Sequence, residues 1–338
     1  MPKRALVTGA TGFVGANVAR ELLERGRSVR VLARASSDRA NIHGLDVEVV
    51  TGDLRDRTAV EGAVRGCDEV YHVAAEYTFW SPDPDAVFAS NVVGTRNVMD
   101  ACLEHHVGRV VYTSTVGTIG LGGNAPPDVP RDENSPLAKD QLTGTYKRSK
   151  FEAERAALEY VARGLPLVVV NPSAPVGPWD RKPTPTGKII VDFMRGKMPA
   201  FLDTGLNIVH VRDVAVGHVL AAERGRIGER YILGNANMSL AQILRTLAKL
   251  TGRKAPRVRI PFGVAYLAGL VSTAVANRLT HSEPAVPLEA VKMARFHMYF
   301  SAAKAVRELG IPETPPENAF SDALVWFRDR GYFDGKSS

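Results

Sequence analysis

The sequence is poor in the residues that mark disulfide-rich and metal-binding proteins. Its 338 residues include two cysteines, Cys67 and Cys102, and eight histidines, and none of these stands at a metal-ligand spacing. We therefore expect no metal site. Two free and mostly buried thiols, in a protein of the reducing cytoplasm, are the expected state of the cysteines.

Strong charge clusters and leader-like segments are also lacking. Lys and Arg outnumber Asp and Glu by 43 to 36, and the net charge of +7 permits anionic ligands such as phosphates. The basic residues form no continuous stripe, so we expect no nucleic-acid partner. The first four residues lack the apolar core of a signal peptide, and we expect a cytoplasmic protein.

The sequence has no apolar run of the length that a bilayer requires. One nearly uncharged stretch, residues 260–276, contains one proline and two glycines and falls short of the ~20 residues of a membrane span. We predict no transmembrane segment here, and a buried helix of a soluble domain. Contact with a lipid-like substrate or with a bilayer surface is the alternative.

What the sequence does contain is a glycine motif between an apolar strand and a helix, in residues 5–15. In such a motif Gly9 makes the tight turn, Gly12 lets a phosphate approach the backbone, and Gly15 lets the helix pack against the strand. The helix start offers unpaired N–H groups to a pyrophosphate, which indicates dinucleotide binding. The cofactor contacts expected in this run are Gly9, Thr11, Gly12, Phe13, Val14 and Gly15.

The end of the second strand indicates which dinucleotide is bound. NAD-selective sites place a carboxylate there for the ribose hydroxyls, whereas an arginine accommodates a 2′-phosphate. Here Arg34 follows the strand, and no carboxylate occurs before Asp38. Because a guanidinium binds phosphate in bidentate fashion, the sequence predicts NADP in preference to NAD, with NAD as the alternative.

Strands and helices alternate through the first half of the chain, which is typical of a parallel sheet. Strands are expected at residues 28–33, 47–50, 69–72, 109–113 and 167–171, and long helices at 85–105 and 145–163. We predict an α/β fold with a Rossmann-like, doubly wound parallel sheet. Residues 1–171, with a return segment near 207–235, form the dinucleotide-binding domain. Residues 172–206 and 236–338 form a smaller, mostly helical substrate lobe.

A tyrosine and a lysine four residues apart carry the chemical signal. Tyr146 and Lys150 share one face of a helix, so the ammonium group and an oxidised nicotinamide can lower the tyrosine pKa toward working pH. The fifth strand ends in hydroxyl side chains, at the edge where open α/β sheets bind ligands. One of these hydroxyls is expected to hold the reacting oxygen in line with the tyrosine.

The glycine motif, this strand end and the Tyr146–Lys150 pair together resemble the extended short-chain dehydrogenases/reductases. The resemblance implies that Thr115 is the catalytic hydroxyl, with Ser114 as the second candidate, and that Lys150 also binds the nicotinamide ribose. It implies an asparagine near the proton relay, at Asn91, and a homodimer formed through two long helices per subunit. Further cofactor contacts are expected at Asp53, Leu54, Ala74, Ala75, Tyr146, Pro172 and Ser173.

At a finer level, residues 171–178, 183–187 and 210–215 resemble hopanoid-associated sugar epimerases and dihydroflavonol reductases. Sugar-nucleotide 4,6-dehydratases have an Asp-Glu pair after the catalytic threonine, whereas Val116 and Gly117 follow Thr115 here. Dehydration is therefore not expected.

Three functions stay open from the sequence. The first is an NADP(H)-dependent oxidoreductase that interconverts a secondary alcohol and a carbonyl. The second is an epimerase acting on a sugar or nucleotide sugar through a retained cofactor, for which a diphosphate would need cationic and amide partners. Its candidate partners are Asn171, Arg181, Lys182, Lys188 and Arg212. The third is a cofactor-sensing protein without catalysis. Candidate substrate contacts are Glu76, Tyr77, Ser114 and Asn171.

Overall fold

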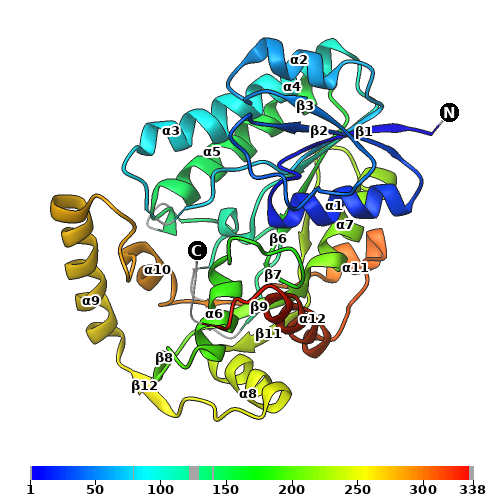
Figure 1. The fold of residues 1–338 in the computed structure, drawn as a ribbon. Coiled ribbons are helices and arrows are strands. Elements are labelled where there is room, and N and C mark those ends of the chain that lie inside the picture. Colours follow the sequence, from blue (N-terminus) through cyan, green and yellow to red (C-terminus); the bar gives the residue numbers. More distant parts are fainter. Residues whose placement is uncertain (1, 79, 122–128, 139–140, 335–338) are drawn as a thin grey trace.

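Seven parallel strands form the large sheet of the computed structural model, which describes residues 2–78, 80–121, 129–138 and 141–334. Their order is β10-β6-β5-β4-β1-β2-β3 (Figure 1). The strands are β1 (Arg4–Thr8), β2 (Ser28–Ala33), β3 (Val47–Thr51), β4 (Glu69–His72), β5 (Arg109–Thr113), β6 (Leu167–Pro172) and β10 (Arg230–Leu233). The chain runs outward in both directions from β1 and β4, so the crevice of a doubly wound sheet lies at their carboxyl ends.

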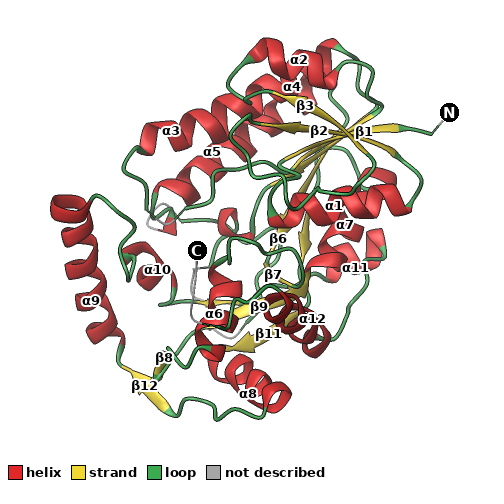
Figure 2. Cartoon of the chain, viewed as in Figure 1, coloured by secondary structure: helices red, strands yellow, loops and turns green. Residues whose placement is uncertain are grey.

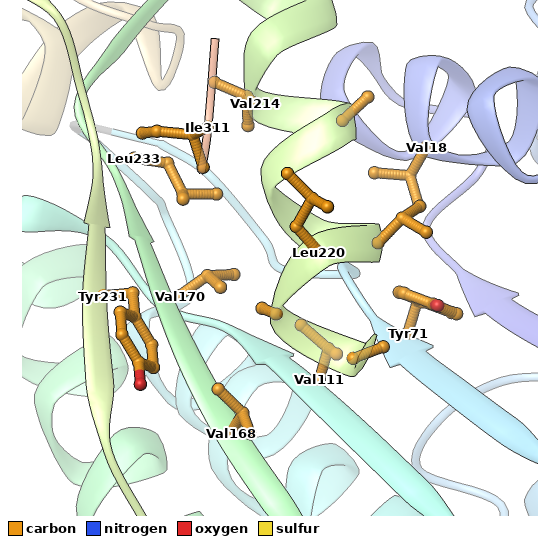
Figure 3. Close-up of a cluster of buried hydrophobic side chains, with 14 of the residues drawn as sticks. Val18, Tyr71, Val111, Val168, Val170, Val214, Leu220, Tyr231, Leu233 and Ile311 are labelled. Atoms are coloured by element: carbon orange, nitrogen blue, oxygen red, sulfur yellow. The ribbon is translucent and has the colours of Figure 1, made fainter. Parts of the chain in front are cut away.

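Alternate residues of each strand pack on opposite faces of this sheet, which is the two-residue period of a strand. One face carries α1 (Phe13–Glu24), α7 (Val211–Arg224) and α11 (Ala303–Leu309). In Figure 3, Val111, Val168 and Val170 of the sheet lie around α7, with Leu220 among them. The fully buried strand faces explain why these strands read as apolar runs.

The other face is covered by α2 (Arg57–Val64), α4 (Gly94–Glu104) and α5 (Thr145–Glu159). Leu6, Val70 and Val110 contribute to its core from the strands. Cys67 and Cys102 belong to the same cluster and are free and buried, as predicted.

The helix expected from Asp85 to His105 exists but is not uniform. It consists of α3 (Pro84–Phe88), a π-helical turn η1 (Ala89–Val93) and α4. A π turn inserts a residue into the helical register and frequently marks a functional site. Two 3₁₀ turns, η2 (Val116–Thr118) and η4 (Val161–Arg163), follow β5 and α5.

A smaller lobe lies beside the carboxyl edge of the large sheet (Figure 2). Its four-stranded sheet contains β7 (Ala174–Val176), β9 (Gly205–His210), β11 (Ala236–Ser239) and β13 (His297–Met298), and β8 (Ala200–Leu202) pairs with β12 (Val258–Ile260). Its helices are α6 (Pro185–Met194), α8 (Leu240–Thr251), α9 (Phe262–Val275), η5 (Ala276–Thr280), α10 (Leu288–Met293) and α12 (Pro316–Asp329). Within the return segment, β9 pairs in this small sheet, whereas β10 rejoins the large one beside β6.

The expectation of a buried helix at residues 260–276 is wrong. Helix α9 stands at the margin of the molecule, with α10 against one side of it (Figure 1). Leu267 is 62% exposed and Val264 is 60% exposed. The sequence could not show this, because an apolar helix without a polar face is typical of burial.

Helix α12 holds the small lobe together through one face, which gives a matched test of the packing. Phe327 is fully buried between Trp326 and Tyr332, whereas Val325 on the same helix is 44% exposed. We expect Phe327→Ala to lower the free energy of unfolding by about 3–5 kcal/mol through cavity formation. Val325→Ala should change it by well under about 1 kcal/mol. Urea denaturation of both variants measures this, and equal losses would contradict the packing described.

Candidate active site

The three glycines of the opening motif bring β1, α1 and β4 into close contact. Gly9 has φ +75, and a Cβ there would stand 2.7 Å from the Cα of Ala74. A Cβ on Gly15 would stand 2.2 Å from the carbonyl oxygen of Gly9. Only glycine fits these two positions without moving the backbone.

Helix α1 begins directly above this turn and offers its N-terminus to an anion. Its N-cap is Gly12, which has no side chain to cap the first N–H groups, and its first turn holds no acidic residue. Thr11, Phe13 and Val14 surround this helix start and are half-buried. The free N–H groups and the helix dipole fit the pyrophosphate of a dinucleotide.

Asn41, which sequence reasoning missed, ties this turn to the small lobe. Its amide donates to the carbonyl oxygens of Thr11 and Trp179, each at 3.1 Å. The guanidinium of Arg20 stacks over the Trp179 ring at 3.5 Å from its centroid. Asn41 lies in a loop after β2 without regular periodicity, so no sequence pattern marks it.

Charged side chains gather where β2 and β3 end. Arg34 is exposed directly after β2, and its guanidinium lies 3.8 Å from the carboxylate of Glu76. Asp53 accepts three hydrogen bonds from Arg55, which lower its pKa to about 2. Leu54 lies against Gly94, and its carbonyl oxygen accepts a hydrogen bond from Asn97. Glu76, expected among the substrate contacts, thus turns its carboxylate toward the arginine expected at the cofactor.

Thr115 and Tyr146 come together from two different elements. Thr115 ends the extended chain after β5, and its hydroxyl caps η2 by accepting from the N–H of Gly117 at 3.1 Å. Tyr146 lies in the first turn of α5, with its phenol beside the Thr115 hydroxyl. Burial raises the pKa of Tyr146 above its usual value, and the Thr115 contact opposes this shift.

The hydroxyl of Ser114 has a different neighbour. It lies 3.4 Å from the hydroxyl of Thr118, in the layer beneath the site, and Ser114 is buried. Of the two hydroxyl candidates at this strand end, Thr115 is therefore the one that reaches Tyr146.

Lys150 points inward to the strand end, one helical turn after Tyr146. Its ammonium group donates to the hydroxyl of Tyr112 at 2.9 Å and to the carbonyl oxygen of Thr113 at 2.7 Å. Burial lowers the Lys150 pKa to about 7, while Glu154 opposes the shift. The i,i+4 spacing predicted that the Lys150 ammonium group points at the phenol oxygen of Tyr146. In the cofactor-free chain it points instead at Tyr112 and Thr113.

The Tyr112 hydroxyl continues into a buried chain of hydrogen bonds, all of which sequence reasoning missed. It contacts Thr95, whose hydroxyl is 2.9 Å from the Nε2 of His72. The Nδ1 of His72 lies 2.8 Å from the Thr8 hydroxyl, which accepts from the N–H of Ala74. Burial lowers the His72 pKa to about 3, so the ring is neutral and bridges two hydroxyls. The lysine is thus connected to the end of β1.

Asn91 lies in the π turn η1 with its amide fully engaged. The side-chain oxygen accepts from the N–H of Glu76 at 2.7 Å, and the NH₂ group donates to the Ser149 hydroxyl and to the carbonyl oxygen of Glu76. This amide therefore fastens the loop after β4 to helix α5. Tyr77, in that loop, packs edge-on against Tyr146 with ring centroids 4.6 Å apart.

Asn171 is fully buried at the end of β6. Its amide donates to the carbonyl oxygen of Thr115 at 3.0 Å and to the carboxylate of Glu154 at 3.1 Å. It supports the Thr115 turn from below and is not open to a substrate, in contrast to the expectation. Ser173, two residues on, donates its hydroxyl to the carbonyl oxygen of Leu233, and Pro172 ends β6.

Three of the four cationic side chains expected around a sugar diphosphate are each paired with an acid. Arg181 pairs with Asp38 at 2.7 Å, Lys188 with Asp192 at 2.5 Å, and Arg212 with Glu24 at 3.0 Å. Each partner lies on a different element, so these groups are distributed over the surface.

The chain matches the profile of the NAD dependent epimerase/dehydratase family over residues 5–234, and it belongs to that family. It is an extended short-chain dehydrogenase/reductase, with the α/β fold predicted above. It is similar to the crystal structure of gox2253, with a TM-score of 0.86, 46% identity, and coverage of 98% of this chain and 99% of that one.

Three curated relatives match nearly end to end. A protein named “Putative dihydroflavonol 4-reductase” from Synechocystis is 46% identical over 96% of this chain and 95% of its own length. Sterol demethylase protein B from Methylococcus capsulatus is 37% identical, over 96% and 98% respectively. A 4-hydroxy-2-methyl-3-oxo-4-farnesyl-3,4-dihydroquinoline-1-oxide ketoreductase from Stigmatella aurantiaca is 32% identical, with 95% of each chain covered.

The buried Lys150 amine makes a testable contribution to stability. Its pKa is about 7 in the folded chain, against 10.5 for an exposed lysine, so between these values the unfolded chain binds more protons. Stability due to this group therefore rises with pH in that window. We expect the melting temperature of the cofactor-free protein, relative to Lys150→Met, to increase from neutral to alkaline pH. The exposed Lys188→Met variant is the control, and a constant difference for Lys150→Met would contradict the burial.

Proposed function

We propose that this chain is an NADP(H)-dependent reductase that interconverts a lipophilic ketone and its secondary alcohol. The observation that carries the proposal is the proximity of Tyr146 to Thr115 at the carboxyl end of β5, in the sheet whose strand β1 leads into the glycine turn. The bound dinucleotide supplies the hydride in such a reaction, and the chain supplies the proton and the alignment. The names of the relatives, a ketoreductase among them, support a redox reaction at a carbonyl.

The raised pKa of Tyr146 suits the direction of reduction. A phenol that stays protonated at neutral pH donates its proton to a carbonyl oxygen, whereas oxidation of an alcohol requires the phenolate. The Thr115 hydroxyl donates to the same carbonyl oxygen and holds it beside the phenol. Lys150 is held by Tyr112 and Thr113 one helical turn from the phenol, on the same side of the site.

Asn91 and Asn171 act as positioning residues in this proposal. Asn91 fixes the loop that presents Tyr77 to Tyr146, and Asn171 fixes the backbone of Thr115. Both amides are buried, so neither side chain has to contact the substrate.

Reduction is favoured over sugar epimerisation by the surface charges. The epimerase hypothesis needs cations around a diphosphate, and Arg181, Lys188 and Arg212 are instead paired with acids on separate elements. Two relatives carry sterol or farnesyl in their names, which supports a large lipophilic substrate.

Replacing the proposed proton donor tests the mechanism directly. We expect Tyr146→Phe to lower NADPH-dependent turnover of a ketone by about 10²-fold or more, because the general acid is lost. Cofactor affinity should change by less than about threefold, since the phenol is not needed to bind the dinucleotide. Steady-state kinetics and fluorescence titration measure the two effects. Tyr160→Phe, at the other end of α5, is the control, and full activity of Tyr146→Phe would contradict the proposal.

The cofactor preference rests on Arg34, which is exposed where β2 ends. We expect Arg34→Glu to weaken NADPH binding about tenfold or more relative to NADH, because a carboxylate repels the 2′-phosphate. Titration of both reduced cofactors measures the ratio. Arg57→Glu on the exposed face of α2 controls for net charge. Equal losses of affinity for NADPH and NADH would show that Arg34 does not bind the 2′-phosphate.

A further inference from the structure

Helix α9 exposes a continuous apolar face. Val264, Leu267, Val271 and Val275 recur at spacings of three and four residues, so they lie on one side of the helix, and they are 60%, 62%, 57% and 40% exposed. This spacing normally marks the face that packs into a core. An exposed face of this kind indicates an interaction surface.

The opposite face of α9 is covered, so the exposed face is held in place. Gly269 lies against Leu288 of α10, close enough that a Cβ would stand 3.3 Å from its Cα. The hydroxyls of Ser272 and Thr273 accept from the N–H groups of Val286 and Leu288. Helices α9 and α10 therefore form one helical hairpin with a single apolar side left uncovered.

The segment that carries this helix is also the basic part of the chain. Residues 252–296 contain seven lysines and arginines against two glutamates, which gives five of the net charge of +7. Arg259 and Arg295 line the same hollow as Phe262, at the start of α9. Apolar side chains flanked by cations match the chemistry of an anionic lipid surface.

The geometry of the flanking strands fits a helix that lies on a bilayer. Among the described residues, Phe262–Thr280 alone is long and apolar enough to cross a membrane. However, β12 before it pairs with β8, and β13 after it pairs with β9, and these two partners are adjacent in the chain. In a single span the chain after Thr280 would emerge on the far side of the bilayer, whereas Val286 and Leu288 lie back along α9 and β13 rejoins β9.

A second copy of the chain is a poorer occupant of the same face. In a two-fold dimer identical patches meet, so two segments of net charge +5 would face each other. Anionic lipid headgroups instead neutralise the charge while the acyl region accepts the apolar face.

We propose that the exposed face of α9 docks this protein on an anionic membrane surface. Asn277, in η5 at the end of the helix, accepts a hydrogen bond from the indole of Trp80, which follows the loop of Tyr77. Phe262 and Tyr266 line a hollow of about 470 Å³ together with Lys147, the neighbour of Tyr146. The side of the docked helix that carries Phe262 and Tyr266 therefore lines a hollow beside the proposed site, and a lipophilic substrate enters there from the bilayer.

Vesicle flotation tests the docking without any turnover. We expect the protein to float with vesicles of equal parts phosphatidylcholine and phosphatidylglycerol, less with phosphatidylcholine alone, and less at high ionic strength. The double variant Leu267→Ser and Val271→Ser should bind the anionic vesicles about tenfold or more weakly. Arg253→Gln with Lys254→Gln should reduce binding in the same direction.

Two matched variants control for polarity and charge elsewhere. Ile227→Ser with Val325→Ser removes exposed apolar side chains outside α9, and Arg96→Gln with Arg163→Gln removes two exposed cations; both should bind as the parent does. An unchanged melting temperature verifies folding. The proposal is overturned if the parent does not float with anionic vesicles or if the α9 variant floats equally well. It is also overturned if the α9 substitutions turn a dimer into a monomer and leave vesicle binding unchanged.

The entry of substrate from the bilayer rests on the proposed reductase activity and has its own measurement. With a lipophilic ketone in anionic vesicles, the α9 variant should lose turnover, while its turnover of a small water-soluble ketone should match that of the parent. Failure to reduce either ketone would contradict the proposed function, and flotation would still decide the docking. Equal loss with both ketones would contradict bilayer entry.

Discussion

The site depends on how one buried amine is held. The Lys150 ammonium has left water, and an unpaired cation there would cost several kcal/mol. The Tyr112 hydroxyl and the Thr113 carbonyl oxygen compensate this cost only if β5 and α5 keep their present spacing. The same spacing sets where Thr115 and Tyr146 meet, because Thr115 follows Thr113 at the end of β5 and Tyr146 precedes Lys150 by one turn of α5. The lysine therefore fixes the geometry of the site as well as its charge.

A chain of buried hydrogen bonds extends this constraint to the cofactor turn. Tyr112, Thr95, His72 and Thr8 link the amine to the N–H of Ala74, which lies against Gly9. The proton positions are mutually consistent. The Thr95 hydroxyl donates to the carbonyl oxygen of Asn91, so it accepts from the Tyr112 hydroxyl and from the Nε2–H of the neutral His72, whose Nδ1 accepts from the Thr8 hydroxyl. The glycine turn and Tyr146, the proposed places of the dinucleotide and the substrate, thus share one support.

Much of this arrangement could be predicted from the sequence, because it follows from local patterns. Strands β2, β4 and β5 have the predicted bounds, and the glycine spacing indicated the contacts that the backbone makes at Gly9 and Gly15. The role of Tyr112 could also have been found, since alternation along β5 directs it toward α5. The pairing of Arg181 with Asp38 and of Arg212 with Glu24 could not, because these partners are remote in sequence, whereas Lys188 and Asp192 stand at the i,i+4 spacing of a helical ion pair.

The largest departure from the sequence prediction concerns helix α9, and it has a physical reason. An apolar composition indicates that a segment is stabilised by removal from water, but it does not indicate whether protein or lipid covers the segment. In this chain α10 covers one side of α9 and leaves the other exposed beside a basic segment. The exposed helix is consistent with the lipophilic substrate proposed for the reductase.

Deuterium transfer tests the central claim most directly, since reduction and epimerisation move the hydride to different final places. The protein is incubated with NADPH deuterated at the transferable position and a lipophilic ketone, and the products are examined by mass spectrometry. The account predicts one deuterium in the product alcohol for each NADPH oxidised, with the oxidised cofactor released. Retention of the cofactor through gel filtration, with no NADPH consumed by any ketone and an inverted sugar carbinol formed, would contradict it.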